Sequence, residues 1–505
     1  MNETFPAPRP RSKKLSWKTI LLIAVLVLVF AYAVEKTQIN LDKPLDPGRQ
    51  GNVIRVLRLL ANPDLVQVEN GRIVGPSEAL SITVDRIVET ILMALMASTI
   101  GTLLAIPISF IAARNLMEPV TAPLAAIMAA VLALPIGGSA GWLAGSLLMG
   151  LTAPAAAQPL IGMVTAVILA VITWALLKFG PPLIAGDKQT SGQKAVALLR
   201  LLLALTTGYL TLGILAQLGE AFGQWLMAAL GFFGFIGSFF TVTADTLLLG
   251  LPALAALLAG FMALSYGSRI GQEAVLSLSG WPARLLTGVL TGLGTAVIVF
   301  SIGSFLNWLY QFDQPQNWTT LPALISSVVG LVLGLVSAPK RPFRIGFVIY
   351  SITRGILNIL RSIEPLIMGI VFVVWVSLGP FAGVMALTLH SIAALGKLFS
   401  EQVEGIDGGP IEAITATGAN KLQIISFGVI PQIIPPFIAF TLYRWDINVR
   451  MSTIIGFVGG GGIGFILSQN IQQLRYRQAS VMMLSIAIVV ALLDYVSSKI
   501  RARII

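Results

Sequence analysis

Long apolar runs, each closed at both ends by polar or basic residues, take up most of the chain. A transmembrane helix needs about 20 predominantly apolar residues, more than most core helices of soluble domains contain. Twelve runs approach or exceed that length, at 17–34, 87–112, 121–150, 159–179, 196–217, 243–266, 285–309, 320–338, 363–379, 381–398, 430–446 and 479–497. The pattern therefore predicts an all-α integral membrane protein with about twelve spans.

Two segments leave the number of spans open. Residues 121–150 would form a hairpin if the helix broke at the Pro-Ile-Gly-Gly sequence of 135–138, and residues 222–241 would either cross the membrane or form an interfacial half-helix. Both changes together give 14 spans and turn four basic residues outward, namely Lys178, Lys188, Lys194 and Arg200. Because cytoplasmic loops carry the excess of Lys and Arg, we prefer twelve spans with both termini in the cytoplasm.

The N-terminal region, 1–80, is predicted to hold one span and an extracytoplasmic segment. The run at 17–34 follows several basic residues, and its alternative interpretation is a cleaved signal peptide, because Ala31-Tyr32-Ala33 resembles a cleavage site. Residues 41–80 are polar, and within them VIRVLRLL (53–60) has the pattern of a short amphipathic helix on the bilayer surface.

Composition supports a membrane protein and excludes several other classes. The chain is 56% hydrophobic and 11% charged, with a mean hydropathy of +0.87, whereas soluble domains carry about 25% charged residues. The net charge of +11 is scattered between apolar runs, which fits topology setting and anionic headgroups rather than nucleic acid. Cysteine is absent, His390 is the one histidine, and no cluster has metal-ligand spacing. Catalysis and a cofactor in this chain are therefore not expected.

A stretch of mixed polarity, 396–467, interrupts the apolar sequence near its end. Both span counts place 401–431 in the cytoplasm. There, GIDGGP (405–410) predicts a break, and PIEAITATG predicts a short helix that starts at Pro410, has Glu412 in its first turn and ends at Gly418. Three alanines, at 413, 416 and 419, would keep one flank of this helix small enough to dock on a partner. An ordinary loop with a capped helix is the alternative.

The spacing in this stretch resembles the EAA loop of ABC-importer permeases. Glu412-Ala413 is followed by Gly418 and then by Pro431, although Gly428 stands where that family often has Ile. The flanking sequences LHSIAALGKLFSEQVEGID and TLYRWDINVRMSTIIGFVGGGGIG resemble the phosphonate-type branch of binding-protein-dependent ABC permeases. The same branch is resembled by two further segments, ETILMALMASTIGTLLAIPISFIAARN (89–115) and RGILNILRSIEPLI (354–367).

The resemblance covers roughly 80–115 and 345–500, less than half of the chain. It implies a type I importer permease core with a large transmembrane insertion that has no counterpart in the usual short permease. The predicted division is 1–80 for the N-terminal region, 81–118 for the first part of the core, 119–344 for the insertion and 345–505 for the rest of the core.

The resemblance also implies partners in the cell membrane. Two permease subunits, expected to be two copies of this chain, would enclose a path through the lipid bilayer. ATPase subunits would bind ATP and Mg²⁺, and an extracytoplasmic solute-binding protein would deliver substrate. No G-x-x-x-x-G-K-[ST] sequence occurs here, so ATP hydrolysis is assigned to the partner. The residues expected to couple to the ATPase are Glu412, Ala413, Ala416, Gly418, Leu422 and Pro431.

Two further groups are candidates for the path or its gate. Arg444, Asp446 and Arg450, with Asn448 between them, are expected at the outer end of the 430–446 span. They would form either a cationic entrance for a small oxyanion or an interfacial anchor in which Asp446 neutralises an Arg. The second group is glycine-rich and predicts either a dimer-interface turn near the gate or plain helix packing. Its members are Gly459, Gly460, Gly461, Gly462 and Gly464.

Three functions remain open from the sequence. The first is a permease for phosphonate or a related phosphorus oxyanion such as phosphite. The second is a permease for another small solute such as an amino acid, because methionine-type permeases share the glycine-rich ending. The third is a membrane-embedded enzyme or scaffold whose main body is the insertion. A catalytic body should carry clustered polar side chains at membrane depth, and the acidic residues of the insertion are instead widely spaced. They are Asp187, Glu220, Asp245, Glu273 and Asp313.

Overall fold

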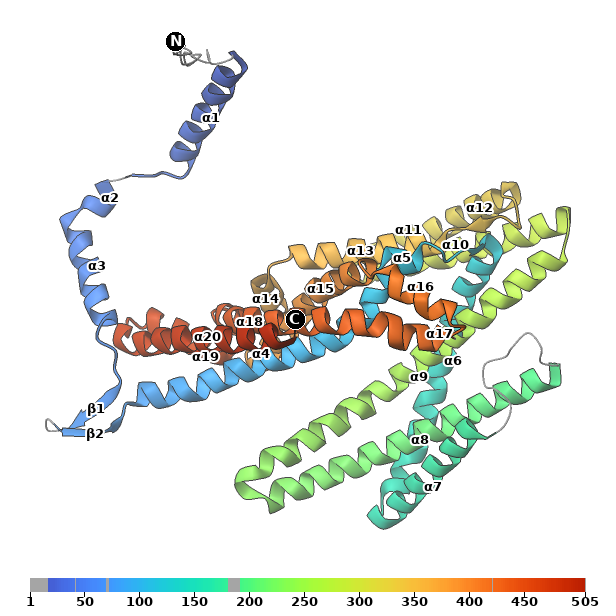
Figure 1. The fold of residues 1–505 in the computed structure, drawn as a ribbon, viewed down its shortest axis with the longest axis horizontal. Helices are drawn as coiled ribbons and strands as arrows, with labels where there is room; N and C mark the ends of the chain where they lie inside the picture. The colour runs from blue at the N-terminus through green and yellow to red at the C-terminus, as the bar shows by residue number, and fades with distance from the viewer. Residues whose placement is uncertain (1–16, 41, 70–71, 180–190, 420, 505) are drawn as a thin grey trace, which may run out of the picture. The chain divides into compact units, whose positions relative to one another are not determined.

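The computed structural model describes residues 17–40, 42–69, 72–179, 191–419 and 421–504 and is almost entirely helical. Figure 1 shows these elements in order along the chain. The helices up to the middle of the chain are α1 (Trp17–Lys36), α2 (Asp42–Leu45), α3 (Pro47–Leu60), α4 (Glu78–Ile111), α5 (Arg114–Met117), α6 (Leu124–Ala156), α7 (Pro159–Lys178), α8 (Ser191–Ala229) and α9 (Gly234–Ser277). The later helices are α10 (Trp281–Tyr310), α11 (Pro315–Trp318), α12 (Thr320–Val336), α13 (Ile345–Ser362), α14 (Pro365–Val376), α15 (Pro380–Glu404), α16 (Gly408–Ala416), α17 (Lys421–Ile424), α18 (Ile430–Gly456), α19 (Gly462–Gln472) and α20 (Tyr476–Ile504). The all-α prediction is confirmed.

The strands are four short segments in two separate pairs. One pair is an antiparallel hairpin of β1 (Val66–Glu69) and β2 (Arg72–Pro76). The other joins β3 (Ala122–Pro123) to β4 (Pro342–Phe343).

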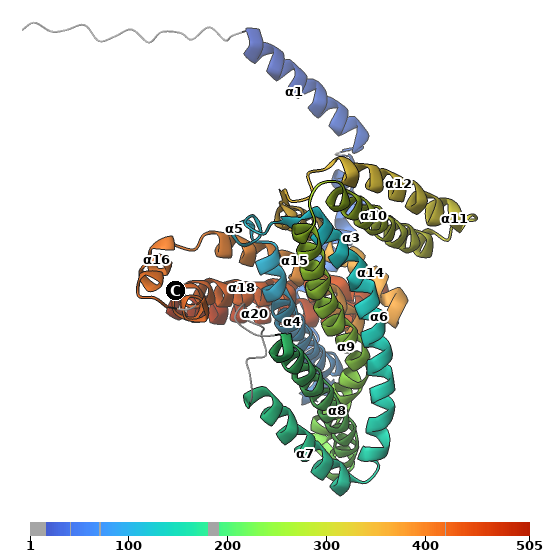
Figure 2. The same ribbon diagram turned by 90° about the vertical axis from the view of Figure 1, so that its right-hand side faces the viewer.

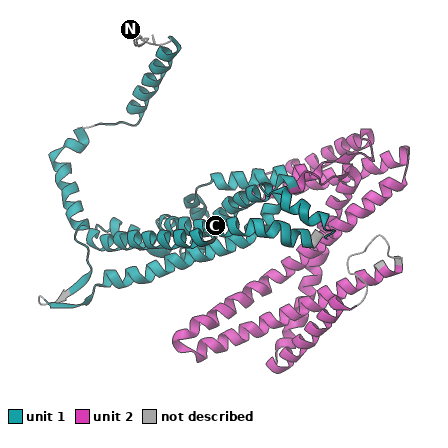
Figure 3. Cartoon of the chain, viewed as in Figure 1, with its two compact units in different colours: residues 1–115, 350–505 teal, residues 116–349 magenta. Residues whose placement is uncertain are grey.

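The chain divides into two compact units, coloured separately in Figure 3. Unit 1 comprises residues 1–115 and 350–505, and unit 2 comprises residues 116–349. The insertion predicted from the sequence, 119–344, lies within unit 2 and falls a few residues short of its bounds at both ends. Within unit 2, β3 and β4 pair close to the two points where the chain enters and leaves the unit. The insertion therefore begins and ends at one place within unit 2.

Among the described residues, eleven helices are long and apolar enough to cross a membrane, and the bent pair of α13 and α14 raises the number to twelve. These twelve correspond one to one to the twelve apolar runs. The alternative of 14 spans is wrong because α6 passes through Pro135 as one helix that ends at Ala156. Beyond Pro135, α6 packs closely on α9. At Gly141, for example, a Cβ would lie 2.5 Å from the carbonyl oxygen of Ala255, so only glycine allows this approach.

The segment 222–241 is neither a half-helix nor a span. It consists of the end of α8, a 3₁₀ turn at Gly231–Phe233 and the start of α9. Gly231 has φ +52°, which favours glycine and allows the chain to reverse within a few residues. Apolar length could not reveal this turn, because the residues on both sides of it are as hydrophobic as a span.

In unit 1, helix α4 lies against α15, α18, α19 and α20. Figure 1 shows α4, α18 and α20 running side by side. The core beneath the polar loop includes Ala105 of α4, Leu395 and Phe399 of α15 and Phe437 of α18, all buried. The rings of Phe399 and Phe437 stack with centroids 3.9 Å apart. This packing fixes the ends of α15 and α18 between which the polar loop lies.

The amphipathic segment predicted at 53–60 is helical and begins earlier, at Pro47. The side chain of Asp46 accepts a hydrogen bond from the Arg49 amide at 3.1 Å, and Pro47 suits the first helical position. Its last residue is tied to α20, because the Ser480 hydroxyl donates to the carbonyl oxygen of Leu60. The position of α3 on the bilayer surface stays a prediction. Helix α1 has no buried residue, and its apolar side chains are exposed except that of Val34, which is half-buried.

Unit 2 is built on four long helices and a helical pair. Helix α9 packs along α6 and α8, α7 packs on α8, and α10 packs on α12. Figure 2 shows α8 beside α7, with α6 and α9 next to them. Many contacts in unit 2 are made at glycines, as where Gly292 of α10 approaches α12: a Cβ there would lie 2.9 Å from the carbonyl oxygen of Ser327. Small residues at such contacts are typical of helices that pack in a membrane.

Candidate functional site

The polar loop folds as a short helix on a tight turn. Helix α16 begins at Gly408 because the side chain of Asp407 accepts a hydrogen bond from the Gly409 amide at 3.0 Å. This start is two residues earlier than predicted, so the placement of Glu412 in the first turn is wrong: Glu412 lies in the second turn and is exposed. Ala413 and Ala416 are also exposed, which leaves a face of small residues and one carboxylate open to a partner.

The opposite face of α16 holds the helix in place. Ile411 and Ile414 are half-buried, and a Cβ on Gly428 would lie 3.4 Å from both side chains. Gly428 belongs to a π-helical turn, Ile425–Val429, that precedes α18. Glycine, where related loops often have Ile, therefore allows α16 to lie close to this turn.

Gln432, next to Pro431, closes the loop. Its side-chain oxygen accepts from the Asp407 amide at 3.0 Å, and its Nε2 donates to the Gly428 carbonyl oxygen at 2.7 Å. The start of α16 is thereby bound to the start of α18. A displacement of α16 by a partner would reach α18 through these contacts.

Gly418 lies just after the end of α16 with φ +80°. The prediction that a residue tolerant of positive φ ends this helix is confirmed. A hollow of about 470 Å³ beside it is lined by Ile414, Thr417, Gly418, Ala419, Gln423 and Phe427. Asn420 and the side chain of Leu422, a predicted coupling residue, lie outside the described residues.

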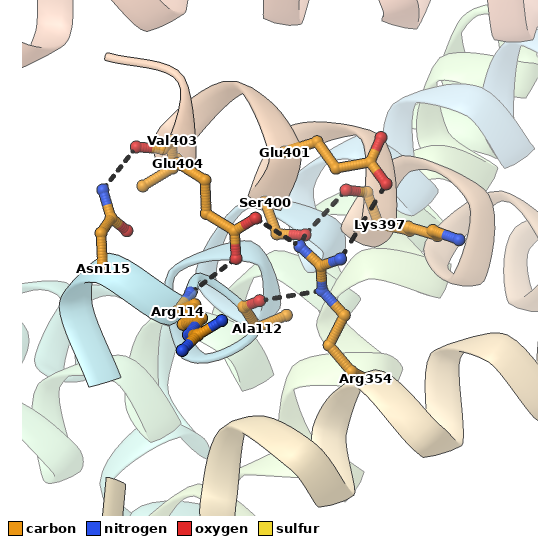
Figure 4. Close-up of polar contacts among 9 residues, drawn as sticks. All are labelled: Ala112, Arg114, Asn115, Arg354, Lys397, Ser400, Glu401, Val403 and Glu404. Carbon is orange, nitrogen blue, oxygen red and sulfur yellow. Dashed lines mark hydrogen bonds and ion pairs between the residues drawn. The ribbon is translucent and has the colours of Figure 1, made fainter. Parts of the chain in front are cut away.

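Arg354 joins three elements at the point where α15 ends and the polar loop begins. Figure 4 shows its guanidinium between the end of α4 and the last turn of α15. It donates to the Ala112 carbonyl oxygen at 3.2 Å and the Ser400 hydroxyl at 3.2 Å, and it pairs with Glu404 at 3.0 Å. The Glu404 carboxylate also accepts from the Arg114 amide at 2.7 Å. We call Arg354 and Glu404 the clamp.

The clamp was not predicted from the sequence. Both residues lie in the segments that carry the family resemblance, but no spacing rule connects positions 50 residues apart. Its hydrogen bonds and ion pair join α13 to the ends of α4 and α15 at the root of the loop.

Replacing Arg354 with Gln is expected to lower the thermal stability of the protein. The substitution leaves Glu404, partly buried, without its charged partner, and a hydrogen bond to a charged group contributes about 2 kcal/mol. Melting of the purified chain measures the effect. Lys397→Gln removes a charge from α15, the helix that carries Glu404, and is the control, since its side chain points away from the clamp in Figure 4. Equal melting temperatures of the Arg354→Gln and Lys397→Gln variants would contradict a stabilising role of the clamp.

Arg444, Asp446 and Asn448 are buried within α18. The helix continues beyond the predicted end of the span at 446, to Gly456, so these side chains lie within α18 and not at its end. Their depth in the membrane stays a prediction. The helix accommodates these side chains because neighbouring helices supply partners. Arg444 Nε donates to the Ser391 hydroxyl at 3.1 Å, and Asn448 Nδ2 donates to Ser391 and Ser98, both at 2.9 Å.

Arg450 and Asp446 form an ion pair at 2.5 Å, one turn apart on α18. The Asp446 side chain is 4% exposed and that of Arg450 is 51% exposed, so the pair connects the buried polar group to the surface of unit 1. Several buried polar atoms here lack a hydrogen-bond partner among the described residues, namely Arg444 Nη2, Asp446 Oδ1, Asn448 Oδ1, Trp445 Nε1 and His390 Nδ1. Buried polar groups are nearly always satisfied, so this group is suited to a further polar partner.

The glycine-rich segment forms the sharp turn between α18 and α19. Gly459, Gly461 and Gly462 have φ of +95°, +77° and +67°. Two α4 side chains fix the turn: Glu89 accepts from the Gly462 amide at 3.0 Å, and Thr90 accepts from the Ile463 amide at 2.8 Å.

The rest of this turn packs within unit 1 as well. Gly460 lies against Gly383 of α15, and Gly464 lies against Thr453 of α18. These contacts support helix packing within the chain, whereas a role at a dimer interface or gate stays a prediction.

No group of three or more His, Asp or Glu side chains that could hold a metal ion occurs in the part of the chain that the structure describes. The site consists of the short helix α16, held by Gln432 and the clamp, and of a buried polar group on α18 whose partners lie on α4 and α15. Neither arrangement contains a paired nucleophile and base.

Comparisons with known proteins agree with this arrangement. Residues 330–504 match the family model described as "Binding-protein-dependent transport system inner membrane component". The phosphite transport system permease protein of Stutzerimonas stutzeri is 34% identical over 258 residues, which cover 48% of this chain and 92% of that protein. A putative cryptic phosphonate transport system permease protein of Escherichia coli is 46% identical over 121 residues, covering 24% of this chain and 99% of that protein.

A third relative is matched over a smaller part of its length. The phosphate-import permease protein of Mycolicibacterium smegmatis is 34% identical over 183 residues, covering 36% of this chain and 33% of that protein. The residues that match the family model include the polar loop, α18 and the glycine turn.

Proposed function

Because the chain belongs to the phosphonate-type branch of the binding-protein-dependent ABC transporter permeases, we propose that it forms the membrane path of an importer for a phosphorus oxyanion. The observation that carries this proposal is the match over 92% of the length of a phosphite transport permease. The phosphonate and phosphate permeases among its relatives transport chemically similar ions.

The ATPase partner is proposed to dock on α16. The exposed Glu412, Ala413 and Ala416 offer a narrow face, and the hollow beside Gly418 gives room for a protruding side chain of the partner. Gln432 and the clamp would pass a movement of α16 to α18 and α4. ATP and Mg²⁺ would be bound by that partner.

A solute-binding protein and a second permease subunit complete the proposed assembly. A second copy of this chain is the simplest partner, with the path between the two copies. The buried polar group of α18 is the proposed contact for the oxyanion, because Arg444 retains a hydrogen-bond donor, Nη2, that is unused among the described residues. A guanidinium suits phosphoryl oxygens in charge and geometry.

Reconstitution tests the substrate class. Vesicles that contain the chain, its ATPase and its binding protein should take up labelled phosphite or methylphosphonate when ATP is supplied. Methionine is the competing substrate to include, because the alternative is an amino-acid permease. ATP-dependent uptake of methionine without uptake of phosphorus compounds would reject the proposal and favour that alternative.

Single cysteines test the proposed topology, since the sequence contains no cysteine. With both termini in the cytoplasm, Gly405→Cys and Thr190→Cys should react with an impermeant maleimide only from the cytoplasmic side, although Thr190 lies outside the described residues. Leu65→Cys should react only from the outer side. Labelling of Gly405→Cys from outside would invert the topology and remove α16 from the reach of an ATPase.

A further inference from the structure

A groove of about 640 Å³ lies within unit 2, between α6, α7, α8 and α9. Its volume is within the range of roughly 300–1,000 Å³ that is typical of small-molecule sites. Its lining is almost entirely apolar and includes Ala144, Ala170, Trp174, Leu177, Leu201 and Leu258.

The hydroxyl groups in the groove wall are already hydrogen-bonded to backbone carbonyl oxygens or to a neighbouring hydroxyl. The Tyr209 hydroxyl donates to the Gly145 carbonyl oxygen at 2.8 Å, which joins α8 to α6. The Thr173 and Thr207 hydroxyls lie 2.7 Å apart and join α7 to α8. The wall therefore offers mostly hydrocarbon surface, which suits an apolar chain.

One end of the groove is basic. Trp174 and Leu177 line it, and the Lys178 ammonium lies 4.7 Å from the centroid of the Trp174 ring. Arg200, next to Leu201, donates to the carbonyl oxygens of the last turn of α7, including that of Leu177 at 3.2 Å. Two cations and an indole ring thus meet at the end of α7, an arrangement typical of the level of lipid headgroups.

Lys178 is available to a ligand. Within the part of the chain that the structure describes, its ammonium lies over the rings of Trp174 and Phe179 and pairs with no carboxylate. The side chain is exposed. A negatively charged group at this end of the groove would therefore meet an unpaired cation.

We propose that this groove holds an acyl chain of an anionic phospholipid whose headgroup lies at Lys178. The length of apolar wall accounts for the chain, and the basic end accounts for the charge of the headgroup. A neutral lipid would fill the groove equally well but would gain nothing from Lys178. This inference is independent of the substrate that the permease transports.

The test compares two lipids with identical acyl chains. The full-length protein is reconstituted in vesicles of equimolar palmitoyl-oleoyl phosphatidylglycerol and phosphatidylethanolamine, extracted in mild detergent, and weighed with its retained lipid by native mass spectrometry. The wild type should retain phosphatidylglycerol in preference. Lys178→Gln should reduce that preference about fivefold, the order expected for one lysine near an anionic surface.

Two pairs of variants separate the groove from general effects. Ala170→Trp fills the groove and should reduce retention of both lipids, whereas Val171→Trp, one position along and outside the lining, should not. Lys499→Gln removes a lysine that likewise lies over an aromatic ring, that of Tyr495, and should leave the preference unchanged.

The proposal fails if the wild type retains both lipids equally, or if Ala170→Trp retains as much lipid as Val171→Trp. Mass spectra in which the groove variants change the oligomeric state instead of the bound lipid would also overturn it, because a second copy of the chain would then be the occupant.

Discussion

Replacing Gly418 with Val is expected to abolish most ATP-driven uptake while the chain remains inserted and folded. Gly418 has φ +80°, a conformation that costs an ordinary L-residue about 1–2 kcal/mol and a β-branched residue more. Among the described residues other than its two chain neighbours, no atom lies within 4 Å of the position of its Cβ, so the damage is expected from the backbone conformation. The end of α16 would shift, and with it the face that is proposed to meet the ATPase.

The measurement is uptake and ATP hydrolysis in the same vesicles. Gly418→Val should hydrolyse ATP without matching uptake, whereas Gly418→Asn should keep most of its uptake, because Asn tolerates positive φ better than other residues with a side chain. Gly405→Ala is a second control in the same loop, since Gly405 has φ −88°. Normal uptake by Gly418→Val would show that the geometry of α16 does not matter for coupling.

The division into spans could be predicted from the sequence because apolar length marks each run and the distribution of Lys and Arg favours twelve spans over 14. Each of the twelve runs corresponds to a helix, or to the bent pair, in the structure. The end of α16 could also be predicted, since Gly418 is a local signal. The helix starts were less accurate: Asp407, a capping residue, decides the start of α16, and the prediction had used Pro410 instead.

The contacts that build the site could not be predicted in this way. Glu89 reaches Gly462 across 373 positions, and Arg354 reaches Glu404 across 50. Periodicity describes one helix at a time, so it contains no information on which side chains meet between helices. For the same reason the charges at 444–450 suggested the end of a span, whereas Ser391 and Ser98 on other helices supply the partners that let α18 continue.

These partners change what is expected of the two arginines. Arg450 pairs with Asp446, which is nearly fully buried, so Arg450→Gln should leave an unpaired buried carboxylate and reduce assembly. Arg450→Lys should be milder because it keeps the charge. The double variant Asp446→Asn with Arg450→Gln removes both charges and should restore assembly. Restored uptake in that double variant would assign Arg450 to the anchor role alone.

Arg444→Gln is expected to slow uptake by at least about tenfold per assembled complex, the order of one hydrogen bond made by a charged group. Asn448 still donates to Ser391 in this variant, so the contact between α18 and α15 persists and assembly should fall less than uptake. Arg444→Lys keeps the charge but loses the planar guanidinium fork. If the oxyanion binds this fork, the Arg444→Lys variant should take it up more slowly than the wild type does. Labelled phosphite uptake, normalised to the complex assembled with the ATPase, gives the result. Normalised uptake equal to that of the wild type in Arg444→Gln would assign this arginine to packing, and the contact for the oxyanion would have to lie elsewhere.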